Sequence, residues 1–257
     1  MTRRLTILFA VAVCLTTCAR FASASTVTLT DYTAGNSDFA NNAWVDVTAG
    51  GNEYSGYGGP FTATTSGGLL GNTSFITFCL EINEEFYYNA TYNYSLADGA
   101  VPGGLGGQNP GGGNYDPLSD ATKWLYYQIV SGAYSSWYSN ATGLSLDGNA
   151  GANFQYAIWN LENELTNGQT PAAGLSLATY ALAHENIGDV SAAGYTVYAM
   201  NLTDANGNYA QDQLAYTYDP LTTENTPSVP EPASLLLLGT GLLAAYRVKR
   251  RRAKIAS

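Results

Sequence analysis

Cys79 and Gln155 are the two residues whose types suggest chemistry between side chains. The chain holds three cysteines in 257 residues, and Cys14 and Cys18 lie in an N-terminal run that we expect to be removed on export. Cys79 would then be the only thiol of an exported chain, which is unusual in an oxidising compartment. Four roles are open to it: an inert core residue, an intermolecular disulfide, a nucleophile, or a covalent cross-link within the chain.

The sequence around these two residues predicts a strand and a helix. Residues 74–82 form an apolar run with Cys79 at its centre, which is typical of a β-strand. In residues 153–165 the apolar side chains recur at the spacing of one buried helix face. Gln155 directly follows Phe154 and therefore lies at the edge of that face. We expect the two side chains to face each other.

A thiol and a carboxamide can form an internal thioester. The thiolate adds to the amide carbon of Gln155, ammonia leaves, and the two side chains are joined without any cofactor. Aromatic walls would have to protect such an electrophile from water. We expect Phe78, Tyr156, Trp159 and Tyr87 to supply these walls.

Two sequence blocks resemble the signature blocks of bacterial thioester domains. They are Phe78-Cys79-Leu80 and the run FQYAIW at 154–159, and the resemblance extends over about residues 70–218. The segment 124–130 resembles the Trp/Tyr-rich helix that lies between those blocks. One departure is Phe154, where the family often has Thr. The resemblance implies a thioester between Cys79 and Gln155 that captures amine- or hydroxyl-bearing surface polymers.

The pattern of the remaining chain predicts an α+β ectodomain over residues 25–218. We expect a β-rich, sandwich- or barrel-like domain with an inserted helical subdomain at about 117–187. Helices are predicted at about 120–130, with Ser119 or Asp120 as N-cap, and at 153–165 and 177–186. Strands are predicted at 26–30, 43–47, 74–82, 87–96, 195–202 and 213–218.

The charge distribution excludes nucleic acid as a partner. Nine of the ten basic residues lie in the first 20 or the last 11 positions, and Lys123 is the exception. All twenty acidic residues lie within 25–232, so this stretch has a formal charge of −19. Such a surface repels a phosphate backbone.

The sequence offers little support for conventional catalysis. His184 is the only histidine, and we expect it at the surface. The acidic groups Glu81, Glu84 and Glu85, and Glu162 and Glu164, are interpreted as solvated. The segment 204–208 is interpreted as a turn, because it lacks the acidic spacing of a calcium loop. We therefore expect no enzyme, no catalytic residue, no metal site and no cofactor.

The N-terminus has the pattern of a secretory signal peptide over residues 1–24. Two arginines precede an apolar run at 5–15, and Ala22-Ser23-Ala24 is an A-x-A cleavage site that leaves Ser25 as the mature N-terminus. An uncleaved anchor and a lipoprotein signal at Cys18 are the alternatives, although the apolar run is short for a membrane span.

The C-terminus combines three features in order. A linker at 219–228 leads to Val229-Pro230-Glu231-Pro232, then to an apolar segment at 233–246, then to a basic cluster. Fourteen helical residues extend about 21 Å, against about 30 Å for a hydrocarbon core. Local thinning of the bilayer and the basic residues could close this gap, so we expect a transmembrane helix there. The basic cluster includes Arg247, Arg250, Arg251 and Arg252.

This order, over residues 229–254, resembles the PEP-CTERM sorting signal of exported bacterial proteins. The resemblance implies recognition by an exosortase through Pro230, Glu231 and Pro232, with the chain held in the inner membrane by its helix before processing. It also implies release to the cell surface, outer envelope or extracellular matrix, in species that make exopolysaccharide. The expected function is a covalent adhesin or matrix cross-linker. The alternative is a non-covalent structural or polysaccharide-binding protein with an inert buried cysteine.

Overall fold

The computed structural model describes residues 25–32, 37–49, 52–101, 105 and 115–220. The expected signal peptide at 1–24, the apolar segment 233–246 and the sorting signal at 229–254 lie outside these residues, as does all but the start of the linker at 219–228. Within the described part, no helix has both the length and the apolar character that a membrane crossing requires.

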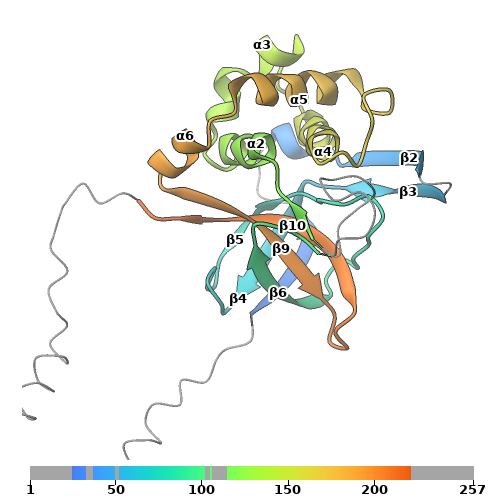
Figure 1. Cartoon of the computed structure of the whole chain (residues 1–257), viewed down its shortest axis with the longest axis vertical. Helices are drawn as coiled ribbons and strands as arrows, with labels where there is room; N and C mark the ends of the chain where they lie inside the picture. The colour runs from blue at the N-terminus through green and yellow to red at the C-terminus, as the bar shows by residue number, and fades with distance from the viewer. Residues whose placement is uncertain (1–24, 33–36, 50–51, 102–104, 106–114, 221–257) are drawn as a thin grey trace, which may run out of the picture. The chain divides into compact units, whose positions relative to one another are not determined.

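The main element is a six-stranded antiparallel sheet in the order β10-β9-β6-β1-β4-β5 (Figure 1). Successive side chains of β1 and β4 alternate between a buried and a more exposed face, as the period of an extended strand requires. The strands are β1 (Thr26–Asp31), β4 (Phe61–Ser66), β5 (Ser74–Thr77), β6 (Thr91–Ala97), β9 (Tyr195–Thr203) and β10 (Tyr209–Tyr218).

The two outer strands of this sheet meet along a seam. Beyond β5 the chain stays extended, and Cys79 forms an antiparallel bridge with Gln213 of β10. The N–H of Leu80 donates to the carbonyl of Asp212 at 3.0 Å, and the N–H of Leu214 donates to the carbonyl of Phe78 at 3.0 Å. These bonds close the sheet on itself in the manner of a barrel, with Cys79 on the seam.

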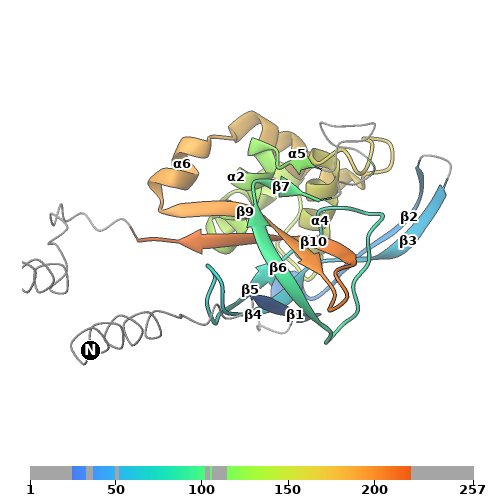
Figure 2. The ribbon, with the colours of Figure 1, turned by 60° about the horizontal axis from the view of Figure 1, so that its bottom comes forward.

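Two small sheets accompany the large one. The first is a hairpin of β2 (Ala43–Ala49) and β3 (Asn52–Gly58), which projects beside the helices in Figures 1 and 2. The second joins β7 (Gly99–Ala100) to β8 (Asp116–Pro117).

A layer of helices covers one side of the sheet, as Figure 1 shows. Helix α2 begins after Ser119, whose hydroxyl accepts the N–H of Thr122 as an N-cap. The helices are α2 (Asp120–Val130), α3 (Tyr138–Thr142), α4 (Ala150–Leu161), α5 (Ala172–His184) and α6 (Ile187–Ala192), with short 3-10 turns at Ser37–Phe39 and Ala133–Ser136.

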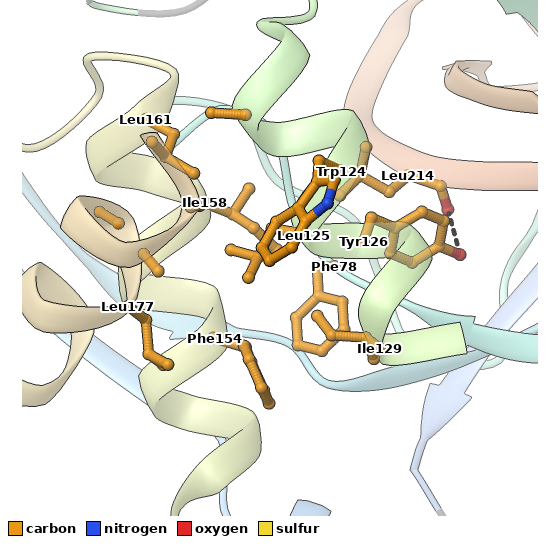
Figure 3. Close-up of a cluster of buried hydrophobic side chains, with 14 of the residues drawn as sticks. Phe78, Trp124, Leu125, Tyr126, Ile129, Phe154, Ile158, Leu161, Leu177 and Leu214 are labelled. Carbon is orange, nitrogen blue, oxygen red and sulfur yellow. Dashed lines mark hydrogen bonds between the residues drawn. The ribbon is translucent and has the colours of Figure 1, made fainter. Parts of the chain in front are cut away.

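The core between helices and sheet is apolar and largely aromatic. Figure 3 shows Phe78 among side chains of α2 and α4, such as Leu125 and Phe154, and Leu177 of α5 belongs to the same buried cluster. Because neighbouring residues of an extended segment point to opposite faces, Cys79 enters a second cluster. That cluster contains Phe61, Ile82 and Trp159 among its buried members.

The mixture of strands and helices that was predicted is confirmed, and the structure gives it the form of a large antiparallel sheet with a helical layer; several boundaries differ from the prediction. The expected strand 74–82 ends at Thr77, and the strand expected at 87–96 covers Thr91–Ala97. The helix expected at 153–165 spans Ala150–Leu161, because Asn163 adopts a left-handed φ of 61° just after its end. The helix expected at 177–186 is longer at its N-terminus, beginning at Ala172. Strands β3 and β4 were not predicted, since their Gly-, Ser- and Thr-rich sequences suggested turns.

Candidate functional site

The fold brings Cys79 and Gln155 into direct contact. Both residues have no exposed surface. The side-chain Oε1 of Gln155 accepts the N–H of Cys79 at 2.9 Å, and its Nε2 donates to the carbonyl of Cys79 at 2.9 Å. The side-chain carboxamide of Gln155, on α4, thus bonds to both the N–H and the carbonyl of Cys79 on the seam.

Gly58, at the end of β3, and the following Gly59 pack directly against this pair. A β-carbon on Gly59 would stand 3.0 Å from Oε1 of Gln155, and one on Gly58 would stand 2.9 Å from Cγ of Gln155. These contacts are closer than ordinary van der Waals packing allows. Glycine at both positions lets the backbone cover the amide.

Burial controls the acidity of the Cys79 thiol. Removal from water raises the pKa of Cys79 to about 12, although the Gln213 side chain and the Gly59 backbone both donate toward the sulfur. The Nε2 of Gln213 lies 3.5 Å from Sγ. A thiol in this setting is protonated at neutral pH and shielded from external reagents.

Only some of the aromatic residues that were expected to shield Cys79 and Gln155 lie next to them. Trp159, which is 1% exposed, and Tyr156 pack in the cluster that contains Cys79. Phe78 points into the other cluster, so it does not wall the sulfur. Tyr87 is 76% exposed, and its expected role as a wall is wrong, because the chain has left the seam before it reaches this residue.

Two walls that sequence patterns did not reveal are Phe61 and Ile82, which share the buried cluster of Cys79. Phe61 lies on β4, a strand that was not predicted.

Tyr156 contributes in another way: its hydroxyl donates to the carbonyl of Trp44 at 2.6 Å and accepts the N–H of Trp44 at 3.1 Å. These bonds fasten the β2–β3 hairpin to α4.

A cleft of about 400 Å³ opens on the outer side of Trp159. The buried Nε1 of Trp159 has no hydrogen-bond partner. The same side chain lines the cleft and packs against Gly58, which also lies against Gln155. The cleft is lined mainly by aromatic and acidic side chains, among them Glu53, Tyr54, Tyr57, Phe61, Glu84 and Tyr88.

The interpretation of the acidic groups as solvated is wrong for most of them. Glu81 is 2% exposed, Glu164 is 4% exposed and Glu162 is 6% exposed, whereas Glu85 is exposed. Glu162 accepts both the N–H of Ser119 at 3.2 Å and its hydroxyl at 2.8 Å at the start of α2. Burial nevertheless raises the pKa of Glu162 to about 7. Glu164 accepts the N–H of Ile82 at 2.9 Å, so both carboxylates serve the backbone of neighbouring segments.

Two other expectations are confirmed. His184 is exposed, and its ring stacks on Tyr180 with centroids 3.9 Å apart. Asp204 accepts the N–H groups of Asn206 and Asn208, and Gly207 has a left-handed φ of 84°, so this segment is a turn.

Comparison with known protein families identifies the C-terminal region. Residues 228–252 match the model of the PEP-CTERM protein-sorting motif. This range contains the residues expected to form the signal, from Pro230-Glu231-Pro232 to Arg252. The motif supports an exported protein that an exosortase sorts at the membrane and delivers to the surface. No curated protein and no solved structure matches the chain.

Proposed function

We propose that the exported chain is a covalent adhesin or matrix cross-linker that acts through an internal thioester between Cys79 and Gln155. In this proposal the signal peptide at 1–24 directs export, and the segment 233–246 holds the chain in the inner membrane until the exosortase acts. The observation that carries the proposal is the position of Gln155: its fully buried carboxamide forms two 2.9 Å hydrogen bonds with the backbone N–H and carbonyl of the fully buried Cys79.

The proposed reaction needs no external oxidant or cofactor. Sγ of Cys79 forms a bond to Cδ of Gln155, the bond from Cδ to Nε2 breaks, and the thiol proton leaves with the amino group as ammonia. The hydrogen bond from the Cys79 N–H to Oε1 supports this step, because the oxygen gains negative charge when sulfur adds. An amine then opens the thioester, becomes bonded to Cδ and returns a proton to the sulfur.

The cleft beside Trp159 supports a route for the acceptor. The pair itself has no exposed surface, so a nucleophile reaches it only if Trp159 or the β2–β3 hairpin moves. The negative charge of the ectodomain favours a positively charged amine on the target polymer. Hydroxyl groups of exopolysaccharide are the other acceptor class that fits this chemistry.

Methylamine labelling of the exported protein tests this proposal. The wild-type chain should gain one methylamine at Gln155, and Cys79 should become reactive toward a thiol reagent at the same time. Gln128 is a matched internal control, since it is also buried but bonds to Trp137 rather than to a cysteine. Labelling of Gln128, or of Gln155 in a Cys79→Ala variant, would mean that the amide reacts without a thioester.

A non-covalent polysaccharide-binding protein is the second candidate function. Trp44 and Tyr57 are 49% and 64% exposed, and their rings lie 4.7 Å apart on the hairpin beside the cleft. Aromatic faces of this kind suit contact with sugar rings. In this alternative Cys79 is an inert core residue, and its raised pKa is the favouring observation. Binding of exopolysaccharide that is undiminished in Cys79→Ala and lost in Trp44→Ala would favour this second function.

A further inference from the structure

Three carboxylates gather at the seam of the sheet, next to the segment that carries Cys79. One oxygen from each of Glu81, Glu84 and Asp212 lies within 4.8 Å of the others. Glu81 and Asp212 are 2% and 0% exposed, and Glu84 is half-buried and lines the cleft. Three like charges at this separation repel one another strongly, so the arrangement requires a positive counter-charge or bound protons.

Glu81 is the member that indicates a ligand. Neither of its carboxylate oxygens accepts a hydrogen bond from a backbone N–H or a neutral side chain of the described residues, although the side chain is almost completely buried. The group that it faces is another acid, the carboxyl of Glu84. Buried carboxylates are normally paired, hydrogen-bonded or coordinated to a metal, because burial without a partner is costly. Asp212 is anchored instead: its Oδ1 accepts the N–H of Leu202 at 2.9 Å, and its Oδ2 accepts the N–H of Val101 at 2.7 Å.

Within the part of the chain that the structure describes, no basic side chain pairs with this cluster. Lys123 is the only lysine or arginine between Arg20 and Arg247. Its ammonium group lies on α2, where it pairs with Asp120 at 3.5 Å. The described residues therefore supply no positive charge to the three carboxylates, and a cation from solution is the counter-charge that fits them.

We propose that Glu81, Glu84 and Asp212 bind a calcium ion. Calcium takes oxygen ligands at about 2.3–2.6 Å, so two ligands on opposite sides of the ion stand up to about 5 Å apart. Magnesium prefers about 2.0–2.1 Å, which limits opposite ligands to about 4.2 Å. Because Glu84 borders the cleft, water can complete the coordination shell from that side.

One further feature agrees with a cation at this position. Glu81 lies two residues after Cys79, and Asp212 directly precedes Gln213, the bridge partner of Cys79. A bound ion would therefore hold together the two segments of the seam that position the thiol.

Titration of the purified exported protein with calcium chloride, after removal of metals with EDTA, tests this inference. We expect saturable binding of a single ion by calorimetry and a rise in Tm of at least about 3 °C at saturation. Magnesium chloride should bind at least about tenfold more weakly. No calcium-dependent change in Tm at millimolar concentration, or equal affinity for the two ions, would overturn the calcium assignment.

The variant Glu81→Gln and the control Glu85→Gln make the test specific. Both remove one negative charge from the same segment, but Glu85 is exposed and lies outside the cluster. Glu81→Gln should abolish the calcium response, and its Tm in EDTA should equal or exceed that of the wild type, because the variant no longer buries an unpaired acid. Calcium binding retained by Glu81→Gln, or lost from Glu85→Gln, would contradict the assignment. The inference is independent of the thioester, so Cys79→Ala should bind calcium as the wild type does.

Discussion

Gly58 leaves no room for a β-carbon beneath the indole ring of Trp159: such an atom would stand 2.3 Å from Cη2 of the ring. This contact lets the end of β3 close over α4 while Trp159 covers Gln155. Gly58 therefore packs against two side chains: Trp159, which lines the cleft, and Gln155 of the buried pair.

Gly58→Ala should displace Trp159 and destabilise the protein. Overpacking of a buried contact typically costs about 1–3 kcal/mol, so the free energy of unfolding should fall by that amount in urea titrations. Gly56→Ala is the matched control, since it lies on the same strand and its β-carbon would meet nothing within 4 Å. Equal stability of the two variants would show that Trp159 does not depend on this contact.

Tyr156→Phe should loosen the hairpin over the site. The change removes the hydroxyl that bonds to both backbone groups of Trp44, at a cost of about 1–3 kcal/mol. We expect faster hydrogen exchange at the Trp44 amide and, if the thioester is present, faster hydrolysis. An exchange rate equal to that of the wild type would mean that the hairpin is held by other contacts.

Without divalent cations, stability should fall as the pH rises. Burial, with the charge of Asp212 as a further cause, raises the pKa of Glu81 well above its ordinary value, and the pKa values of Glu84 and Asp212 are about 7 and about 8. An acid with a raised pKa in the folded state binds its proton more tightly there than in the unfolded chain. Stability is therefore greatest at about pH 4–5 and decreases up to about pH 8.

Thermal unfolding in EDTA at a series of pH values measures this dependence. Glu81→Gln should flatten the slope, because it removes one of the coupled groups without leaving a charge. A wild-type Tm that is constant or rises between pH 5 and pH 8 would contradict the burial of ionisable carboxyl groups at the seam.

The sequence pointed to Cys79 and Gln155 as a candidate pair but not to the acidic cluster, for physical reasons. Cys79 stood out because a lone exported thiol is unusual, and Gln155 was paired with it because its sequence block resembles that of bacterial thioester domains. The burial of Glu81 could not be predicted, since it depends on β10, more than a hundred positions away, meeting the segment after β5. Strand β4 was missed for a related reason: its sequence is rich in Thr, and its burial comes from pairing with β1 and β5 rather than from local pattern.

Glu231→Ala should block processing but not export. The residue lies in the matched sorting motif at residues 228–252, whereas we expect export to depend on the signal peptide predicted at 1–24. Immunoblots of fractionated cells should show the wild type released in a shorter form and the variant retained in the membrane at its longer size. Glu224→Ala is a control with the same charge change outside the motif. Normal release of the Glu231→Ala protein would contradict exosortase sorting through this position.

The intact mass of the untreated exported protein tests the central claim most directly. The thioester account predicts that the wild-type chain is lighter by one ammonia than its sequence requires, whereas Cys79→Ala has the mass of its sequence. It also predicts that Cys79 of the native wild type resists alkylation even after unfolding, until the thioester is opened. A wild-type mass equal to the sequence mass, with Cys79 alkylated as soon as the chain is unfolded, would contradict the account and leave a buried thiol that is held by Gln155 without a covalent bond.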